Sequence, residues 1–285
     1  MNGPLGLAVL VALASTSSAV RAQTLREYSS TRQDHGESRL AATIQYTGGT
    51  LELAPAPAGI LYALRLTYDA DRVAPVARFD AGTPRLTLGT EALRQSGGVR
   101  VSHRGTPPAA TIGLGTHADL DLDIELGAAE ANLELGGIRI SRLSLQTGAS
   151  KTVVRFSEAN PIRCSEAELS AGAAELLVVG LGYSRCGEVH FTGGVGKVTL
   201  DFGGRWSGPI HLDANMAMGE LVLRVPRQAG VKLELDKFLA SFAPAGLVRS
   251  ADGRTWMSGG FAGASQQLVV EVETAFGGVT VEWIE

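Results

Sequence analysis

Four carboxylates alternate with apolar residues in one short stretch of the sequence, and their type and spacing are the most suited to chemistry. The stretch "DLDLDIEL", residues 119–126, carries Asp119, Asp121, Asp123 and Glu125 at every second position. In a β-strand this spacing places all four side chains on one face. Such a row can bind Ca²⁺, which takes about six to eight oxygen ligands, or act on sugars through two carboxylates about 5–10 Å apart. A solvated outer face is the simpler interpretation, because outward residues of a half-buried strand are polar by default.

The other motifs argue against catalysis. The stretch "GGVGKVT", residues 193–199, lacks the Ser or Thr that a phosphate-binding loop needs directly after Lys197. No His or Cys pair has the spacing of zinc ligands, and no Gly-x-Ser-x-Gly motif is present. A sugar-cleaving site would need charged residues from several strands to converge, with Arg139 and Lys151 as candidates to join the carboxylates. We therefore predict no enzyme, no catalytic residue, no cofactor and no bound metal, with calcium at the carboxylate row as the less favoured alternative.

The two cysteines stand at the same place in two copies of one pattern. The stretch "RCSEAELSAGAAELLVVG", residues 163–180, is followed 22 residues later by "RCGEVHFTGGVGKVTLDF", residues 185–202. Each copy alternates apolar and polar residues, breaks at a small residue, and alternates again. Period 2 is the periodicity of a β-strand, so each copy predicts two short strands joined by a bend.

The same pattern recurs along most of the chain. The small residues at the predicted bends are separated by 21 to 24 residues in the central region, and the pattern returns near both ends: Gly49, Ala129, Ser150, Ala174, Gly196, Gly219 and Gly277. A unit of this size buries its apolar face only by stacking on neighbours. The sequence therefore predicts an all-β fold, a β-solenoid similar to a single-stranded β-helix, in which coils of about 22 residues stack.

Stacking in register predicts that the cysteines pair. Equivalent residues of adjacent coils lie about 4.8 Å apart, and disulfides favour Cα separations of about 4.4–6.8 Å. Cys164 and Cys186 are one repeat apart, so we predict that they form a disulfide between adjacent coils.

Composition divides the chain into four parts. Residues 1–22 have the features of a signal peptide, an apolar run and then small residues before a cleavage site at Gln23. Residues 23–40 are polar without periodicity, which predicts a flexible leader. Residues 41–118 contain longer strands with Pro and Gly and are predicted to form a β-rich N-terminal cap. Residues 119–285 are predicted to form the solenoid.

The tryptophans admit two interpretations. Trp206 and Trp256 lie in Gly-rich turns, where exposed rings can stack on sugars or anchor a partner. Packing over the coil ends is the simpler role. Trp283 fits the inward-facing apolar positions of the last coil.

Two stretches carry a family resemblance. The most specific are "LELGGIRISRLSLQTGASKTVVRFSEAN", residues 133–160, and "GVKLEL", residues 230–235, with a proline shortly before it. They resemble the bacterial toast-rack family, which is similar to the C-terminal domains of LiaF-type cell-envelope stress proteins and to adhesin-like envelope proteins. The resemblance covers nearly the whole chain after residue 22. It implies a stacked β structure and a non-catalytic, exported or membrane-tethered protein tied to envelope stress or adhesion.

These observations lead to one functional expectation. A formal net charge of −4 at pH 7 gives no electrostatic reason to expect nucleic acid as a partner. We expect a periplasmic or secreted scaffold or interaction module of the bacterial cell envelope, without a transmembrane segment after signal cleavage. Its expected partner is an envelope protein or a glycan. The alternative is a polysaccharide-binding or polysaccharide-active β-helix protein.

Overall fold

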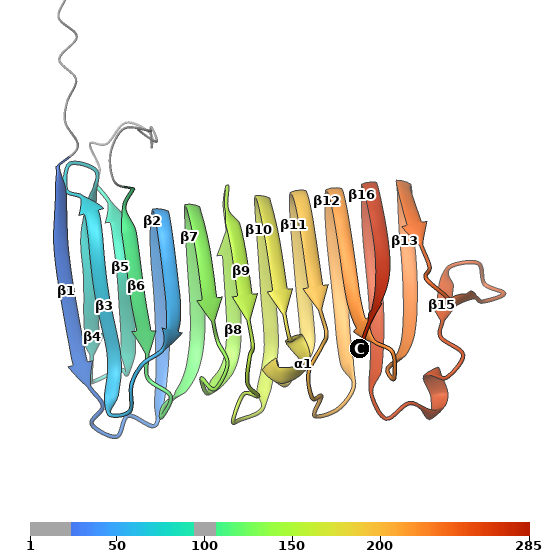
Figure 1. Ribbon diagram of the computed structural model, residues 1–285, viewed down its shortest axis with the longest axis horizontal. Helices are drawn as coiled ribbons and strands as arrows, with labels where there is room; N and C mark the ends of the chain where they lie inside the picture. Colours follow the sequence, from blue (N-terminus) through green and yellow to red (C-terminus); the bar gives the residue numbers. More distant parts are fainter. Residues whose placement is uncertain (1–23, 94–106) are drawn as a thin grey trace, which may run out of the picture.

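The structure is a computed structural model that describes residues 24–93 and 107–285 (Figure 1). All the strands of the described residues belong to one continuous sheet, and helical turns are few, so the all-β prediction is confirmed. The strands are β1 (Leu25–Gln33), β2 (Arg39–Pro55), β3 (Ile60–Asp69), β4 (Val73–Asp80), β5 (Arg85–Ala92), β6 (Ala109–Leu114), β7 (Asp119–Glu134), β8 (Ile140–Thr147), β9 (Lys151–Arg155), β10 (Cys164–Val179), β11 (Cys186–Asp201), β12 (Ile210–Pro226), β13 (Gly230–Ala243), β14 (Val248–Arg249), β15 (Thr255–Met257) and β16 (Gln267–Ile284). The helical turns described are α1 (Leu181–Ser184) and η1 (Phe261–Gly263).

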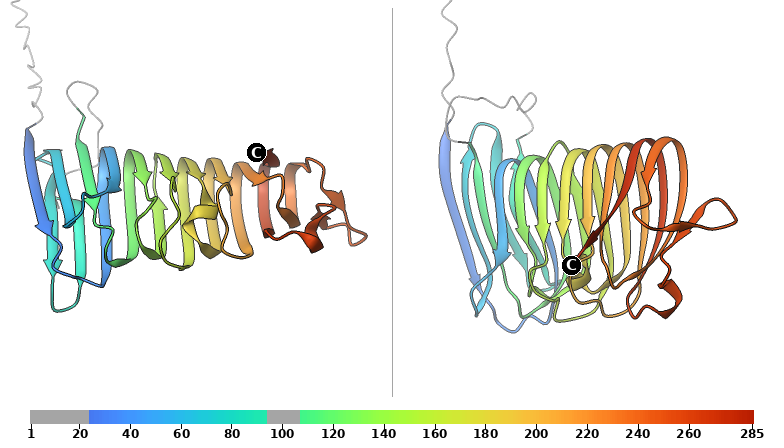
Figure 2. Two further views of the ribbon diagram at one scale, coloured as in Figure 1. Left: turned by 60° about the horizontal axis from the view of Figure 1, so that its bottom comes forward. Right: turned by 45° about the vertical axis from the view of Figure 1, so that its right-hand side comes forward.

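Most rungs of the sheet are single long strands that bend in the middle. The first half of β7 pairs in parallel with β8, and its second half pairs in parallel with β9. We call the half before the bend arm one, the bend the elbow, and the half after it arm two. A return segment then leads the chain back to arm one of the next rung, so that the rungs lie side by side along the long axis of the molecule (Figure 2).

Successive rungs pair in register at the predicted bends. Ala174 pairs with Gly196, Gly196 with Gly219, and Gly219 with Gly277. The three glycines have φ values of 149°, 133° and 122°, a region that glycine tolerates and other residues rarely adopt. The predicted elbows are therefore confirmed, and at these rungs they depend on a backbone conformation that favours glycine.

The last strand of the chain does not lie at the end of the sheet. β12 and β13 are consecutive in sequence, but β16 lies between them and pairs in parallel with both (Figure 1). β13 then forms the last long rung, and β15 covers only its positions Lys232 to Glu234. The repeat around Gly277 was recognised in the sequence, but its place between two earlier rungs was not.

The N-terminal part differs from the prediction in one respect. Residues 23–40 were predicted to be a flexible leader, whereas β1 pairs with β3 from Leu25 to Gln33. The prediction was wrong because β1 is a polar edge strand held by side-chain contacts: the Ser30 hydroxyl lies 3.1 Å from the Tyr62 hydroxyl, and the Arg32 guanidinium lies 4.0 Å from the Phe79 ring centre.

The predicted boundary after residue 118 does not separate two pairing patterns, because β2 already pairs in parallel with β7 along both arms. The predicted signal peptide, residues 1–22, lies outside the described residues. No helix in the described ranges has both the length and the apolar character needed to cross a membrane.

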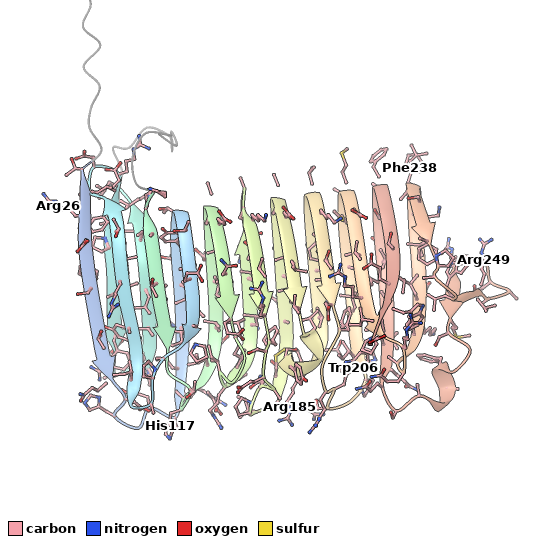
Figure 3. All side chains as sticks on the ribbon, in the orientation of Figure 1. Arg26, His117, Arg185, Trp206, Phe238 and Arg249 are labelled. Carbon is pink, nitrogen blue, oxygen red and sulfur yellow. A yellow bond between two sulfur atoms is a disulfide. The ribbon has the colours of Figure 1, made fainter. Side chains whose placement is uncertain are left out.

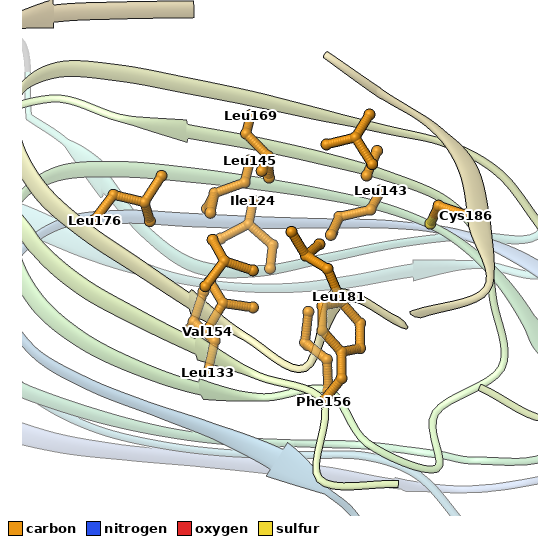
Figure 4. Close-up of a cluster of buried hydrophobic side chains, with 14 of the residues drawn as sticks. Ile124, Leu133, Leu143, Leu145, Val154, Phe156, Leu169, Leu176, Leu181 and Cys186 are labelled. Atoms are coloured by element: carbon orange, nitrogen blue, oxygen red, sulfur yellow. The ribbon is translucent and has the colours of Figure 1, made fainter. Parts of the chain in front are cut away.

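The core lies between the two arms and the return segments. Inward side chains of arm one stack from rung to rung, as Ile124 does on Leu145, and face those of arm two, such as Leu133 and Val154 (Figure 4). Phe156 closes the return side. Leu145 is only 1% exposed, so the inward register predicted from period 2 holds at this position.

Candidate functional site

The predicted carboxylate row lies on the outer face of arm one of β7. Asp119 accepts a hydrogen bond from Arg139 Nε at 2.7 Å, and Glu125 accepts one from Gln45 Nε2 at 3.1 Å. Within the part of the chain that the structure describes, no three His, Cys, Asp or Glu side chains come together as a metal-binding group. The row is therefore spread over a flat face, with its end residue held by an ion pair.

Stacking extends this row into an acidic face across arm one of several rungs. The members alternate with buried residues and lie on β7, β10, β11, β12, β16 and β13: Asp121, Asp123, Glu125, Glu166, Glu168, Glu188, Asp213, Glu271, Glu273, Glu234 and Asp236. Arg142 is a cation within it, and its guanidinium contacts Glu166 at 2.7 Å and Glu168 at 2.9 Å. The hydrogen bond to Glu166 and the charge of Glu168 raise the pKa of Arg142.

Arm two carries a balanced ladder of charges. Lys151 pairs with Glu175 at 4.0 Å, and Lys197 pairs with Glu220 at 2.9 Å. Lys151 thus lies on the opposite arm from the carboxylate row and does not join it. Lys197, the lysine of the phosphate-loop-like stretch, is a member of this surface ladder. Exposed pairs of this kind contribute little to stability, roughly 0–1 kcal/mol each.

Both cysteines and two tryptophans serve packing at the return side or the C-terminal end. Cys164 and Cys186 form the predicted disulfide, with their sulfur atoms 2.02 Å apart. Trp206 is 8% exposed and donates its indole N–H to the Phe202 carbonyl at 2.7 Å. Trp256 is partly buried in a T-shaped contact with Phe242. Of the two interpretations of Trp206, packing is therefore confirmed and the exposed, partner-anchoring ring is not, because the ring is buried at a return segment.

The elbow edge carries a row of exposed apolar side chains that the sequence did not reveal. Val195 pairs with Met218, Met218 with Phe276, and Phe276 with Leu239, so these residues stand side by side on four rungs. Their exposures are 55%, 48%, 42% and 64%, and Phe238 beside them is 75% exposed (Figure 3). We call these five residues the apolar ridge. Phe238 and Phe276 meet in a T-shaped contact with ring centres 6.1 Å apart.

The side chains at this elbow position become larger from the N-terminal rungs toward the C-terminal rungs. The equivalent residues are Gly48 and Ala128 at the N-terminal rungs, and the row continues through Ala173 to the ridge. An adjacent row of large exposed apolar side chains is uncommon on monomeric proteins and marks interaction sites. Three of the ridge rungs are neighbours only because β16 lies between β12 and β13. No periodicity in the sequence predicts that placement.

Comparisons with known proteins give one family match and several distant structural neighbours. The family model for the N-terminal domain of toast_rack (DUF2154) matches residues 21–179. A "putative cell adhesion protein" from Clostridium sporogenes ATCC 15579 is 14% identical, with a TM-score of 0.47 over 92% of this chain and 100% of that chain. A "putative adhesin" from Bacteroides fragilis NCTC 9343 is 13% identical, with a TM-score of 0.42 over 92% of this chain and 97% of that chain. No curated protein matches the chain.

Proposed function

The chain belongs to the toast-rack family, and we propose that it is a non-catalytic, exported interaction module of the bacterial cell envelope. Its proposed architecture is a β-solenoid, in which stacked rungs form a rigid support for outward side chains. Its proposed role is adhesin-like or related to envelope stress. The partner that we propose is an envelope protein with an apolar groove.

The apolar ridge is the observation that carries this proposal. Its five side chains are between 42% and 75% exposed although the core beside them is fully packed. Burying a large apolar side chain stabilises a complex by roughly 1.5–3 kcal/mol. A groove that covered the ridge would therefore gain several such contributions along one line, with Phe238 and Phe276 as aromatic anchors.

The arrangement of the charged residues favours the non-catalytic role. Asp119 is paired with Arg139 on arm one, and Lys151 is paired with Glu175 on arm two. These residues were the candidates for a sugar-cleaving groove, and they are engaged on separate surfaces. The Cys164–Cys186 disulfide favours an oxidising compartment, as expected of an exported protein.

Site-specific photocrosslinking tests the proposal. A photoreactive amino acid replaces Met218 on the ridge or, as a control, Glu175 on arm two, whose side chain is 61% exposed. The folded protein is then irradiated with an envelope fraction. We expect a discrete protein adduct from position 218 that excess unlabelled protein abolishes, and none from position 175. Phe276→Ser should weaken capture by about 30-fold, the equivalent of about 2 kcal/mol.

Three outcomes would contradict this function. Adducts of equal yield at positions 218 and 175 would show that the ridge is not a preferred surface. Unchanged capture by Phe276→Ser would show that apolar contact does not drive binding. Retention on a polysaccharide column with no protein adduct would favour the glycan-binding alternative.

A further inference from the structure

The repeated Arg-Cys pair brings two arginines together on the return side of the molecule. Cys164 pairs with Cys186, and the Cys164 N–H donates to the Arg185 carbonyl at 3.3 Å, so the preceding residues Arg163 and Arg185 lie close together along the backbone. Both line one cavity of about 340 Å³ beside the disulfide. Arg185 lies on the side of the molecule opposite to the elbow edge that carries Phe238 (Figure 3).

Neither arginine has a carboxylate partner among the described residues. Arg185 Nη1 donates only to the backbone carbonyls of Asn160 and Pro161, each at 3.3 Å. By contrast, Arg139, at the start of the preceding rung, binds Asp119 at 2.7 Å. Adjacent like charges on neighbouring strands are unfavourable unless a counter-charge separates them. The cavity is therefore lined by two arginines without a carboxylate partner and by one carboxylate, Glu188, whose partner is His211.

Glu188 also lines this cavity, and Glu166 follows Cys164 by two residues; both carboxylates already have partners. Glu166 is bound by Arg142 at 2.7 Å, and Glu188 faces His211 Nδ1 at 3.0 Å. These two carboxylates are thus turned to partners on arm one. The two arginines stay available for an anion that enters from solvent.

The backbone at Arg185 is held in an unusual conformation. Its φ is 58°, and Ala245 is the other non-glycine residue with positive φ in the described ranges. This left-handed conformation ends the helical turn α1 at Arg185, directly before Cys186. The two carbonyl contacts restrain the position of the Arg185 guanidinium. The site is therefore preorganised before any ligand arrives.

We propose that this cavity binds an oxyanion, the phosphate or carboxylate group of a larger ligand. Guanidinium groups present paired N–H donors whose geometry matches the two oxygens of such groups. Ser207 also lines the cavity, and its hydroxyl can donate to the same ligand. The proposal does not depend on the apolar ridge, which lies on the opposite edge of the molecule.

NMR titration tests this site through the Nε–H signals of the arginines. We expect inorganic phosphate at low salt to shift the signals of Arg163 and Arg185, with a dissociation constant on the order of 1 mM. Arg163→Gln should weaken binding at least about tenfold, because a hydrogen bond between charged groups is lost. Arg155→Gln is the matched control, since Arg155 is an exposed arginine on arm two, and it should bind like the wild type.

Further experiments distinguish the sources of the anion and exclude structural effects. Titration with acetate tests carboxylate carriers, and flotation with phosphatidylglycerol vesicles tests lipid headgroups. Phosphate should also raise the urea midpoint of the wild type but not that of Arg163→Gln, which excludes simple misfolding as the cause. Binding by Arg163→Gln equal to that of the wild type, or shifts of Arg155 equal to those of Arg163, would overturn the proposal. The absence of binding to phosphate, to acetate and to the vesicles would also overturn it.

Discussion

Replacing Gly219 by alanine is the most direct test of how the elbow works. Gly219 has a φ of 133°, and a Cβ atom added there would lie 1.9 Å from the carbonyl oxygen of Gly196 on the adjacent rung. That oxygen belongs to the backbone, so no flexible side chain can move away to relieve the contact. Alanine must either separate two rungs at the elbow or change the local backbone.

The structure allows a rough magnitude. A non-glycine residue in this region of φ costs of order 1–3 kcal/mol, and separating the rungs removes backbone hydrogen bonds worth about 1 kcal/mol each. We expect Gly219→Ala to lower the free energy of unfolding by about 4 kcal/mol. For a domain of this size, such a loss lowers the melting temperature by roughly 8–16 °C.

Urea unfolding and thermal melting measure this effect, and Gly208→Ala is the matched control. Gly208 lies in a return segment, and an added Cβ there meets no atom within 4 Å. The control should stay within about 0.5 kcal/mol of the wild type. If Gly219→Ala were equally neutral, the elbow would be free to adopt the ordinary backbone conformation that alanine uses at position 174. The reasoning from the positive φ would then be refuted.

Three further predictions concern stability. The double variant Cys164→Ala/Cys186→Ala should lose about 3 kcal/mol in urea unfolding, because the disulfide closes a loop with a sequence separation of 22; an unchanged midpoint would contradict this. Leu145→Asp should fail to show a cooperative melt, because it places an unpaired charge in the core, and near-wild-type melting would show that the assigned register is wrong. The Tyr46 hydroxyl is buried without a hydrogen-bond partner among the described residues, and burial raises its pKa above the ordinary value of 10.0. Above pH 10 the unfolded chain releases the phenol proton while the folded chain keeps it, so the Tyr46 contribution to stability should fall by about 1.4 kcal/mol per pH unit. Tyr46→Phe should be as stable as the wild type at neutral pH and should lose less stability between pH 10 and 11; an identical alkaline loss would contradict the assignment.

The rungs and the disulfide were predictable because the same alternating pattern, with a small residue at the bend, recurs along the chain. Period 2 with a small residue at each bend specifies both arms, and stacking in register then places Cys164 beside Cys186. The outer carboxylates were predictable for the same reason, since alternate positions must face solvent. The pairing of Asp119 with Arg139 was not, because it depends on the path of a return segment that has no repeating pattern.

The neighbours of a rung were not predictable from its own residues. The repeats around Gly219 and Gly277 have the same periodicity, and either can stack on the other or on β13. β1 was missed for a related reason. Its residues are mostly polar and do not predict a strand, and it is ordered because it pairs with β3. Local pattern determines the shape of a rung, whereas the partner of each edge is decided by contacts far apart in the chain.

The insertion of β16 links the completion of the fold to the apolar ridge. Met218 and Leu239 belong to strands that are consecutive in the chain, but Phe276 separates them in space. Until residues 267–284 dock, the facing edges of β12 and β13 both lack a partner, and the ridge has a gap at its centre. The continuous apolar line therefore exists only when the end of the chain is in place. If the ridge binds a partner as proposed, changes that loosen β16 should weaken that binding even though they leave the Met218 and Leu239 side chains intact.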